Sequence, residues 1–211
     1  MHENNKRIIT VGVTGASGAV LAQKILALLD ADARVERILL VVTETGQRLF
    51  AEELAIASNS PNHLIERILG HSSQKVEVLP NRDVGASIAS GSYSVDAMAV
   101  IPCSVGTLAK IAAGTCDDLV ARSADVMLKE GRKLVLCVRD TPFSRIHLEN
   151  MLRAQQAGAV IMPAIPSYYH APKNIDDLVT QYVCRVLAQM DLSQDAMFRW
   201  SGSTAAKKAK A

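Results

Sequence analysis

Short runs of apolar residues alternate along the chain with longer stretches in which apolar residues recur every three or four positions. The short runs are rich in Val, Ile and Leu, which is typical of buried strands in a parallel sheet. Several of them end in a turn that contains glycine or proline, and such turns mark the ends of strands. We expect strands at residues 7–13, 37–42, 97–101, 134–139 and 160–162.

The longer stretches predict amphipathic helices, because a helix repeats every 3.6 residues and buries one face. Residues 58–82 contain Pro61, Gly70 and Pro80, and we interpret them as a less regular excursion with one short helix. Pro102 is expected to end the strand before it, since proline has no N–H for a sheet ladder. The expected helices span residues 19–29, 45–57, 64–69, 104–113, 119–129, 144–156 and 175–190.

Strands and helices alternate over the whole chain, which predicts an α/β fold with a parallel sheet and helices on both faces. A length of 211 residues suits one domain, so we assign residues 1–211 to a single domain with flexible tails at 1–6 and 203–211. Right-handed crossovers place the carboxyl ends of all strands at one edge of the sheet, and ligands bind beyond that edge. The turns after the strands are therefore the first places to look for function.

Composition and charge narrow the class of protein. Apolar residues make up 49% of the chain and aromatic residues only 4%, so the core is aliphatic. The net charge is +2, but four cations follow the last acid, Asp195, and without them the balance is 19 − 21 = −2. A nearly neutral body gives no basis for binding nucleic acid.

The cysteines and the apolar runs bear on compartment and metal content. The four cysteines are widely spaced and have no nearby histidine pair, which does not suit a zinc site, and a chain of this size folds without disulfides. No run reaches about 18 apolar residues, the length needed to span a membrane. The N-terminus also lacks the apolar core of a secretion signal. We expect a cytoplasmic protein that holds no metal.

The turn at residues 14–18 (TGASG) joins a strand to a helix and suits an anion or a flavin. The start of a helix offers backbone N–H groups and the positive end of a dipole. The spacing of Gly12, Gly15 and Gly18 departs from the dinucleotide fingerprint, which argues against a nicotinamide cofactor. Ser17 adds a hydroxyl to the turn. The alternative is a tight strand-to-helix turn in which Ser17 only caps the helix.

A second turn, residues 102–107 (PCSVGT), repeats this arrangement after the third expected strand. Ser104 is placed to cap the next helix, and Thr107 directs a hydroxyl into its first turn. Cys103 is a possible nucleophile, but no histidine lies close in sequence. We interpret Cys103 as a small buried residue.

Three cations lie near the middle of the chain. Arg122 and Lys129 are seven residues apart and so share one face of a helix, while Arg139 ends an otherwise apolar strand. Together they would suit a dianionic phosphate. The alternatives are a solvated helix face for the first two, and for Arg139 a salt bridge, with the neighbouring Asp140 as candidate partner.

Residues 163–172 (PAIPSYYHAP) are too rigid and aromatic for a neutral linker. His170 could act as an acid or a base, but a lone histidine is more often a surface residue. Tyr169 lies in this segment, sixteen residues before Arg185, which falls within the last expected helix.

Several motifs occur in the order found in one enzyme family. The chain from about residue 7 to 202 resembles the UbiX-type flavin prenyltransferases in the motifs VGVTGASGA, ASIASGS, PCSVGTLAKIAAG, DDLVARSADVMLKE, LVLCVRDTPFS, AGAVIMPAIPSYYH and MFRWSG. The resemblance implies one flavodoxin-like or Rossmann-like domain that assembles into a large homo-oligomer, usually a dodecamer. It also implies a reaction that joins the dimethylallyl group of dimethylallyl phosphate to N5 and C6 of reduced FMN. By the same resemblance, phosphate is expected to leave without help from a metal, and a UbiD-type decarboxylase, often on the ubiquinone pathway, is expected to use the prenylated FMN.

The same resemblance implies roles for individual residues. Flavin contacts are expected from Gly15, Ala16, Ser17, Thr43, Ser104, Val105, Gly106, Thr107 and Arg139. The pocket for the substrate phosphate is expected to contain Arg122, Lys129, Tyr169 and Arg185. Catalytic roles are expected for Ser17, Glu53, Asp140 and Trp200, of which Trp200 would stabilise positive charge on the allylic group.

Two positions depart from the family pattern. Asp140 stands where a glutamate is usual, and Thr43 stands where a serine is usual. In the family, the acid at the first position is thought to transfer a proton during ring closure. The shorter Asp140 could reach the flavin through a small shift of the backbone or a bridging water. Alternatively, Asp140 only orients Arg139. Thr43 keeps the hydroxyl.

Two other functions are compatible with parts of the chain. Flavin-dependent cysteine decarboxylases share the glycine turn and part of the second turn, but they carry an Asn-Met motif where this chain reads MPAIPSYYH. A non-catalytic FMN carrier would need no second phosphate site, which the cations and Tyr169 would form here.

Overall fold

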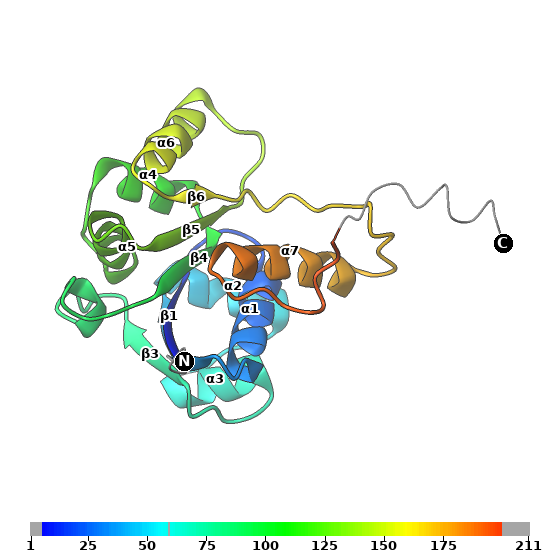
Figure 1. Ribbon diagram of the computed structural model, residues 1–211. Coiled ribbons are helices and arrows are strands. Elements are labelled where there is room, and N and C mark those ends of the chain that lie inside the picture. The colour runs from blue at the N-terminus through cyan, green and yellow to red at the C-terminus, as the bar shows by residue number, and fades with distance from the viewer. Residues whose placement is uncertain (1–5, 59, 200–211) are drawn as a thin grey trace, which may run out of the picture.

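The apolar runs identified above form one six-stranded parallel sheet in the computed structural model, which describes residues 6–58 and 60–199 (Figure 1). Apart from Lys6, the expected tails at 1–6 and 203–211 lie outside the described residues. The strand order, β3-β2-β1-β4-β5-β6, is that of the Rossmann fold, and it reverses between β1 and β4. The strands are β1 Arg7–Val13, β2 Val35–Val42, β3 Val76–Pro80, β4 Ala97–Cys103, β5 Lys133–Val138 and β6 Val160–Ile161.

Helices cover both faces of this sheet, as the alternating pattern predicts. One face packs against α1, α2, α3 and α7 around β1 residues such as Ile9 and Val11. The other face packs against α4, α5 and α6 around β4 residues such as Met98 and Val100. The helices are α1 Ala19–Ala31, α2 Glu44–Leu54, α3 Pro61–Leu69, η1 Ser87–Ala89, α4 Val105–Ala113, α5 Leu119–Lys129, α6 Arg145–Gln156 and α7 Ile175–Gln189.

Residues 58–82 are more regular than expected. The short helix begins three residues earlier, because Ser60 caps it by accepting from the His63 N–H and Pro61 occupies its first turn. After it, residues 76–80 form the edge strand β3, which pairs in parallel with β2. Its residues are only half-buried, so the strand lacks the strongly apolar signal of the central strands.

Several other element ends also differ from expectation, and two of them have a clear local cause. β4 does not stop at Pro102 but continues to Cys103, because the register shift between Val100 and Cys103 lets the ladder pass the proline. α2 ends at Leu54 rather than at 57, since Ala55 adopts a left-handed conformation and its N–H bonds the Phe50 carbonyl.

Candidate functional site

The turns after β1 and β4 meet where the strand order reverses, and Thr14 joins them. Its buried hydroxyl donates to the carbonyl of Pro102 (2.9 Å) and accepts from the N–H of Ser104 (2.8 Å). The Thr14 N–H also donates to that carbonyl (3.2 Å). Sequence reasoning missed Thr14, because a threonine at the end of a strand carries no distinctive signal. It holds the two expected flavin turns against each other.

The turn after β2 lies against the turn after β1. Thr43 caps α2 by accepting from the Gly46 N–H (3.1 Å), and its own N–H donates to the carbonyl of Val13 at the end of β1 (2.9 Å). The hydroxyls of Thr43 and Thr45 lie 3.1 Å apart. A β-carbon at Gly15 would overlap the Thr45 side chain, so this close approach of two turns requires glycine. Thr45 is a second contact that sequence reasoning missed.

Glu53 reaches from α2 to the start of α1. Its carboxylate accepts from the N–H groups of Gly18 (3.0 Å) and Ala19 (2.7 Å). Gly18, the residue that caps α1, provides no side-chain hydrogen bond of its own. Glu53 therefore occupies the anion position at this helix N-terminus, and the alternative in which Ser17 caps α1 is wrong.

The charge of Glu53 is stabilised by its neighbours. Partial loss of hydration works against ionisation, but hydrogen bonds from Gly18, Ser17 and Ala19 and the positive charge of Arg139 outweigh it. The net effect lowers the pKa of Glu53 below its usual value. The structure thus brings Ser17, Glu53 and Arg139 together as an ionised carboxylate beside a hydroxyl and a guanidinium.

The second turn has the local structure that its sequence predicts. Ser104 caps α4 by accepting from the Thr107 N–H (3.2 Å), and its hydroxyl donates to that of Thr107 (3.0 Å). Val105 and Gly106 form the first turn of α4 between them. Cys103 is buried, and burial raises the pKa of its thiol, so it is no nucleophile.

Arg139 follows β5 directly and enters the same region. Its N–H donates to the carbonyl of Cys103 (3.0 Å), which fixes it beside the turn after β4. Its Nε is enclosed by protein, and no described residue accepts a hydrogen bond from it. A buried donor of this kind requires an acceptor, and oxygen atoms of a bound flavin would satisfy it. The expected partner Asp140 instead accepts from the N–H of Thr141 (2.8 Å).

The four residues expected to bind the substrate phosphate are divided between the two faces of the sheet. Arg122 and Lys129 lie on α5, whereas Arg185 lies on α7. Arg122 pairs with Asp125 (3.2 Å) and donates to the Ala89 carbonyl (3.1 Å), and Lys129 pairs with Glu130 (2.6 Å). A single chain therefore does not bring all four together. Spacing along the sequence could not reveal this, because it does not specify which face a helix covers.

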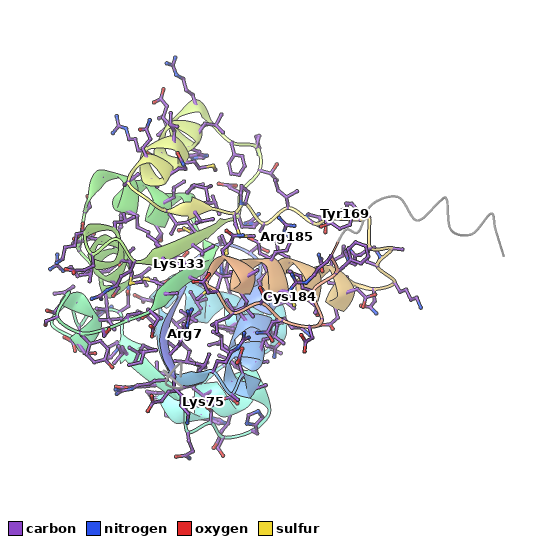
Figure 2. All side chains as sticks on the ribbon, in the orientation of Figure 1. Arg7, Lys75, Lys133, Tyr169, Cys184 and Arg185 are labelled. Atoms are coloured by element: carbon purple, nitrogen blue, oxygen red, sulfur yellow. The ribbon has the colours of Figure 1, made fainter. Side chains whose placement is uncertain are left out.

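Tyr169 and Arg185 do meet, on the side of the molecule where the chain leaves β6 and returns as α7 (Figure 2). Hydrogen bonds from Ser167 and Gln181 and the charge of Arg185 outweigh partial dehydration and lower the pKa of Tyr169. The ring of Tyr169 lies 6.0 Å from that of His170 and 5.5 Å from that of Phe198. His170 is half-buried rather than a plain surface residue, and Trp200 lies outside the described residues.

Comparison with known proteins identifies the family. The model of the Flavoprotein family matches residues 1–187. The flavin prenyltransferase UbiX of Alkalihalophilus pseudofirmus is 42% identical over 201 residues, which cover 95% of this chain and 99% of that protein. The chain belongs to the UbiX family of flavin prenyltransferases.

Solved structures agree with membership of the UbiX family. The structure of AnUbiX (PadA1) in complex with FMN and dimethylallyl pyrophosphate has 41% identity and a TM-score of 0.82, and the match covers 94% of this chain and 99% of that chain. A dodecameric FMN-dependent UbiX-like decarboxylase from Escherichia coli O157:H7 has 39% identity and a TM-score of 0.81, with coverages of 92% and 100%. The expected α/β fold is confirmed.

Two observations concern membranes and metals. Within residues 6–58 and 60–199, no helix has both the length and the apolar character needed to cross a membrane. The same part of the chain shows no cluster of three His, Cys, Asp or Glu side chains placed to hold a metal ion.

Proposed function

We propose that this UbiX-family protein joins the dimethylallyl group of dimethylallyl phosphate to N5 and C6 of reduced FMN and releases phosphate. The observation that carries the proposal is the meeting of three turns at the switch point of the sheet, where Arg139 has an enclosed and unsatisfied Nε beside an ionised Glu53. Relatives that are 42% identical over nearly the whole chain are named flavin prenyltransferases, which supports the proposal.

We propose that FMN is bound at the N-termini of α2 and α4 and by the hydroxyls that cap them, and not at the N-terminus of α1. The N–H groups of Gly18 and Ala19 already hold the Glu53 carboxylate, so a second anion there would meet a negative charge. The starts of α2 and α4 remain, with the hydroxyls of Thr43 and Ser104 at their caps. The turn at 15–17 approaches the start of α2 where Gly15 lies against Thr45, and we propose that Arg139 supplies a donor for a flavin oxygen.

The substrate phosphate is bound between copies of the chain. Arg122 and Lys129 of one copy would complete a pocket with Tyr169 and Arg185 of another, because one chain places them on opposite faces of its sheet. Large apolar side chains are exposed on α6, on the segment before α7 and at the first residue of α7, which suits association with further copies. They are Ile146, Leu148, Leu152, Ile165, Tyr168 and Ile175. We propose a homo-oligomer, as the dodecameric relative suggests.

Each group then has a chemical task. Phosphate is a poor leaving group, and guanidinium and ammonium donors neutralise the charge that develops on its departing oxygen. Holding the allylic carbon against N5 of the flavin removes the entropy cost of a bimolecular encounter. The ionised Glu53, with Ser17 beside it, stabilises the positive charge that arises as the allylic bond breaks. Asp140, next to Arg139, takes part in proton transfer at ring closure.

The alternatives have less support. A cysteine decarboxylase would need the Asn-Met motif that the segment after β6 lacks. A carrier that only holds FMN would have no use for a second anion site, which Tyr169 and Arg185 are held together to form. We further propose that the enzyme works in the cytoplasm, where its free cysteines stay reduced, and that a UbiD-type decarboxylase receives the prenylated FMN.

Anaerobic incubation of the protein with FMN, dithionite and dimethylallyl phosphate tests the function. We expect mass spectrometry to show a flavin heavier by one five-carbon unit, with one phosphate released per flavin. Riboflavin should bind more weakly than FMN, because it lacks the phosphate that the starts of α2 and α4 attract. A parallel incubation with dimethylallyl pyrophosphate decides which ester is used. An unchanged flavin mass in both incubations would refute the proposal.

Asp140→Asn should allow FMN binding but stop the reaction after the first bond. Ring closure must remove the proton from C6, and an amide cannot accept it. Asp140→Glu should be tolerated or faster, since the longer side chain extends the reach by about one ångström toward a hydrogen-bond distance of about 2.6–3.2 Å. Quenched-flow mass spectrometry would detect a singly bonded adduct. Turnover of Asp140→Asn at the parent rate would show that Asp140 moves no proton.

A further inference from the structure

The chain after α7 folds back along the same helix (Figure 1). Met190 and Leu192 are buried at the turn, and their N–H groups bond the carbonyl of Leu187. Gln194 then donates to the Asp32 carboxylate (2.9 Å). The segment reaches Phe198 alongside the first half of α7, two residues before Trp200.

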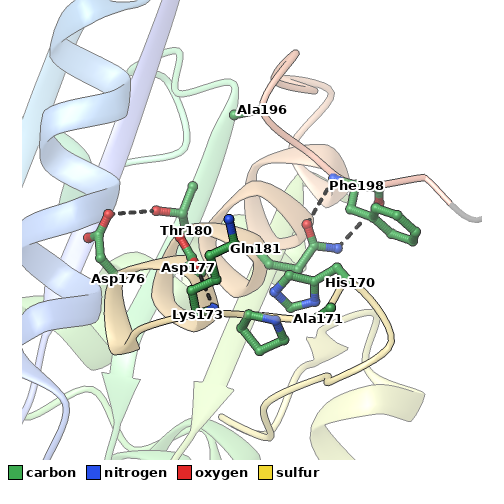
Figure 3. Close-up of a pocket in the computed structure, with 10 residues that line it drawn as sticks. His170, Ala171, Lys173, Asp176, Asp177, Thr180, Gln181, Ala196 and Phe198 are labelled. Carbon is green, nitrogen blue, oxygen red and sulfur yellow. Dashed lines mark hydrogen bonds between the residues drawn. The ribbon is translucent and has the colours of Figure 1, made fainter.

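A buried amide attaches the far end of this returning segment to α7. The Gln181 side chain accepts from the Phe198 N–H (2.9 Å) and donates to the Phe198 carbonyl (3.3 Å), as Figure 3 shows. Gln181 is only 3% exposed, so breaking this pair would leave polar groups without water to replace it. One side chain that pairs with both backbone groups of a residue fixes the position and the direction of this segment.

The attachment also determines what lies against Tyr169. Phe198 stands with its ring 5.5 Å from that of Tyr169 and 6.2 Å from that of His170. The same Gln181 amide contributes a hydrogen bond to the Tyr169 side chain. His170, Gln181 and Phe198 border a hollow of about 520 Å³, which Lys173 and Thr180 also help to line. Gln181 thus holds Tyr169 directly and again through the Phe198 ring.

Arg185 lies one helical turn beyond Gln181 on α7 and acts on the same tyrosine. A residue four positions away on a helix is a close neighbour, so the amide and the guanidinium approach Tyr169 from adjacent turns. The distance between the two phosphate-binding groups therefore depends on where Gln181 holds the tyrosine.

We propose that Gln181 is a positioning residue for the substrate phosphate: its amide fixes Phe198 and Tyr169 so that Tyr169 and Arg185 together receive that phosphate. Gln181 itself does not touch the substrate. This inference rests on the proposed prenyl transfer. In it, the buried Gln181 aligns Tyr169, which precedes α7, with Arg185, which lies on α7.

Gln181→Met tests the proposal, because methionine fills a similar volume without donors or acceptors. We expect the KM for dimethylallyl phosphate to rise about tenfold or more, with kcat changed less than about threefold, as for a lost binding interaction. Inhibition by inorganic phosphate should weaken in the same ratio, and the Kd for FMN should stay constant. Gln194→Met is the matched control, since it removes a glutamine that anchors the same segment far from Tyr169.

A second variant separates positioning from folding. Phe198 is 40% exposed, so Phe198→Ala removes the ring from Tyr169 at little risk to the fold. It should also raise the KM for dimethylallyl phosphate, and its effect should not add to that of Gln181→Met if both act through Tyr169. An unchanged KM in Phe198→Ala, or equal effects of the two glutamine variants, would overturn the proposal. A parent protein that never prenylates FMN would instead refute the function itself.

Discussion

Arg185→Ala should abolish prenyl transfer at ordinary substrate concentrations while FMN still binds. Arg185 lies on α7 beside Tyr169, whereas the flavin turns lie at the switch point of the sheet. Losing one charge-assisted partner of a phosphate costs on the order of 2–4 kcal/mol, or roughly 30- to 1000-fold in kcat/KM. Titration of flavin absorbance and mass analysis of the product measure the two effects separately.

A matched control distinguishes this loss from a general effect of removing charge. Arg48 is an exposed arginine on α2 that pairs only with Glu52 among the described residues, so Arg48→Ala should leave both FMN binding and turnover close to the parent values. Loss of FMN binding in Arg185→Ala would place Arg185 on the flavin phosphate rather than on the substrate phosphate.

Mixed oligomers test whether the phosphate pocket forms between copies. Arg122→Ala and Arg185→Ala are each expected to be inactive alone, because each removes one cation of the pocket. If one copy supplies Arg122 and another supplies Arg185, random assembly of the two variants restores about a quarter of the sites. If both cations came from the same chain, no site would be restored. Co-expression with two different affinity tags and purification over both would isolate the mixed assembly.

The sequence predicted the turns better than it predicted the edges of the fold. The central strand β1 is mostly apolar and a turn that contains glycine follows it, so its bounds are predictable from the sequence. The edge strand β3 is half-buried and includes Glu77, so its pattern resembled a loop. The start of α3 was readable in principle from Ser60 and Pro61, a cap followed by a first-turn proline.

The candidate site also has a part that is predictable from the sequence and a part that is not. Ser17, Glu53 and Arg139 follow from the resemblance, and the structure brings them together. That Glu53 occupies the start of α1 could not be predicted, since the contact joins residues 34 positions apart on two helices. Arg122 and Arg185 are separated because α5 and α7 cover opposite faces of the sheet. The path of the strand-to-strand crossovers decides which face a helix covers, and the hydrophobic pattern within a helix does not.

Glu53→Gln should lower turnover about a hundredfold while the protein stays folded. The carboxylate is ionised at neutral pH between Ser17 and Arg139, so its charge is available to stabilise the positive charge that develops during transfer. Glutamine keeps an oxygen that can accept from Gly18 and Ala19 but carries no charge. The comparison therefore isolates the electrostatic contribution. Initial rates with saturating FMN and dimethylallyl phosphate measure it.

The same substitution should have a small effect on stability, and the sign of its pH dependence follows from the lowered pKa. A negative charge at a helix start contributes roughly 0.3–1 kcal/mol, so the melting temperature should fall by no more than about 4 °C at pH 7. Because the pKa of Glu53 is lower in the folded state, this stabilisation is complete above the usual carboxyl value of 4.5. It disappears as the pH falls through the folded-state value. The melting curves of parent and variant should therefore converge in acid.

Glu52→Gln is the natural control for this prediction, since Glu52 is the neighbouring acid on the same helix. Its side chain is 58% exposed and pairs with Arg48 (3.1 Å) across one turn of α2, an interaction of about 0.3–0.5 kcal/mol. Removing its charge should change neither turnover nor the pH dependence of melting. A turnover loss in Glu52→Gln together with parent activity in Glu53→Gln would contradict the assignment. Parallel losses in both would mean that the net charge of α2, rather than the contact with α1, controls the reaction.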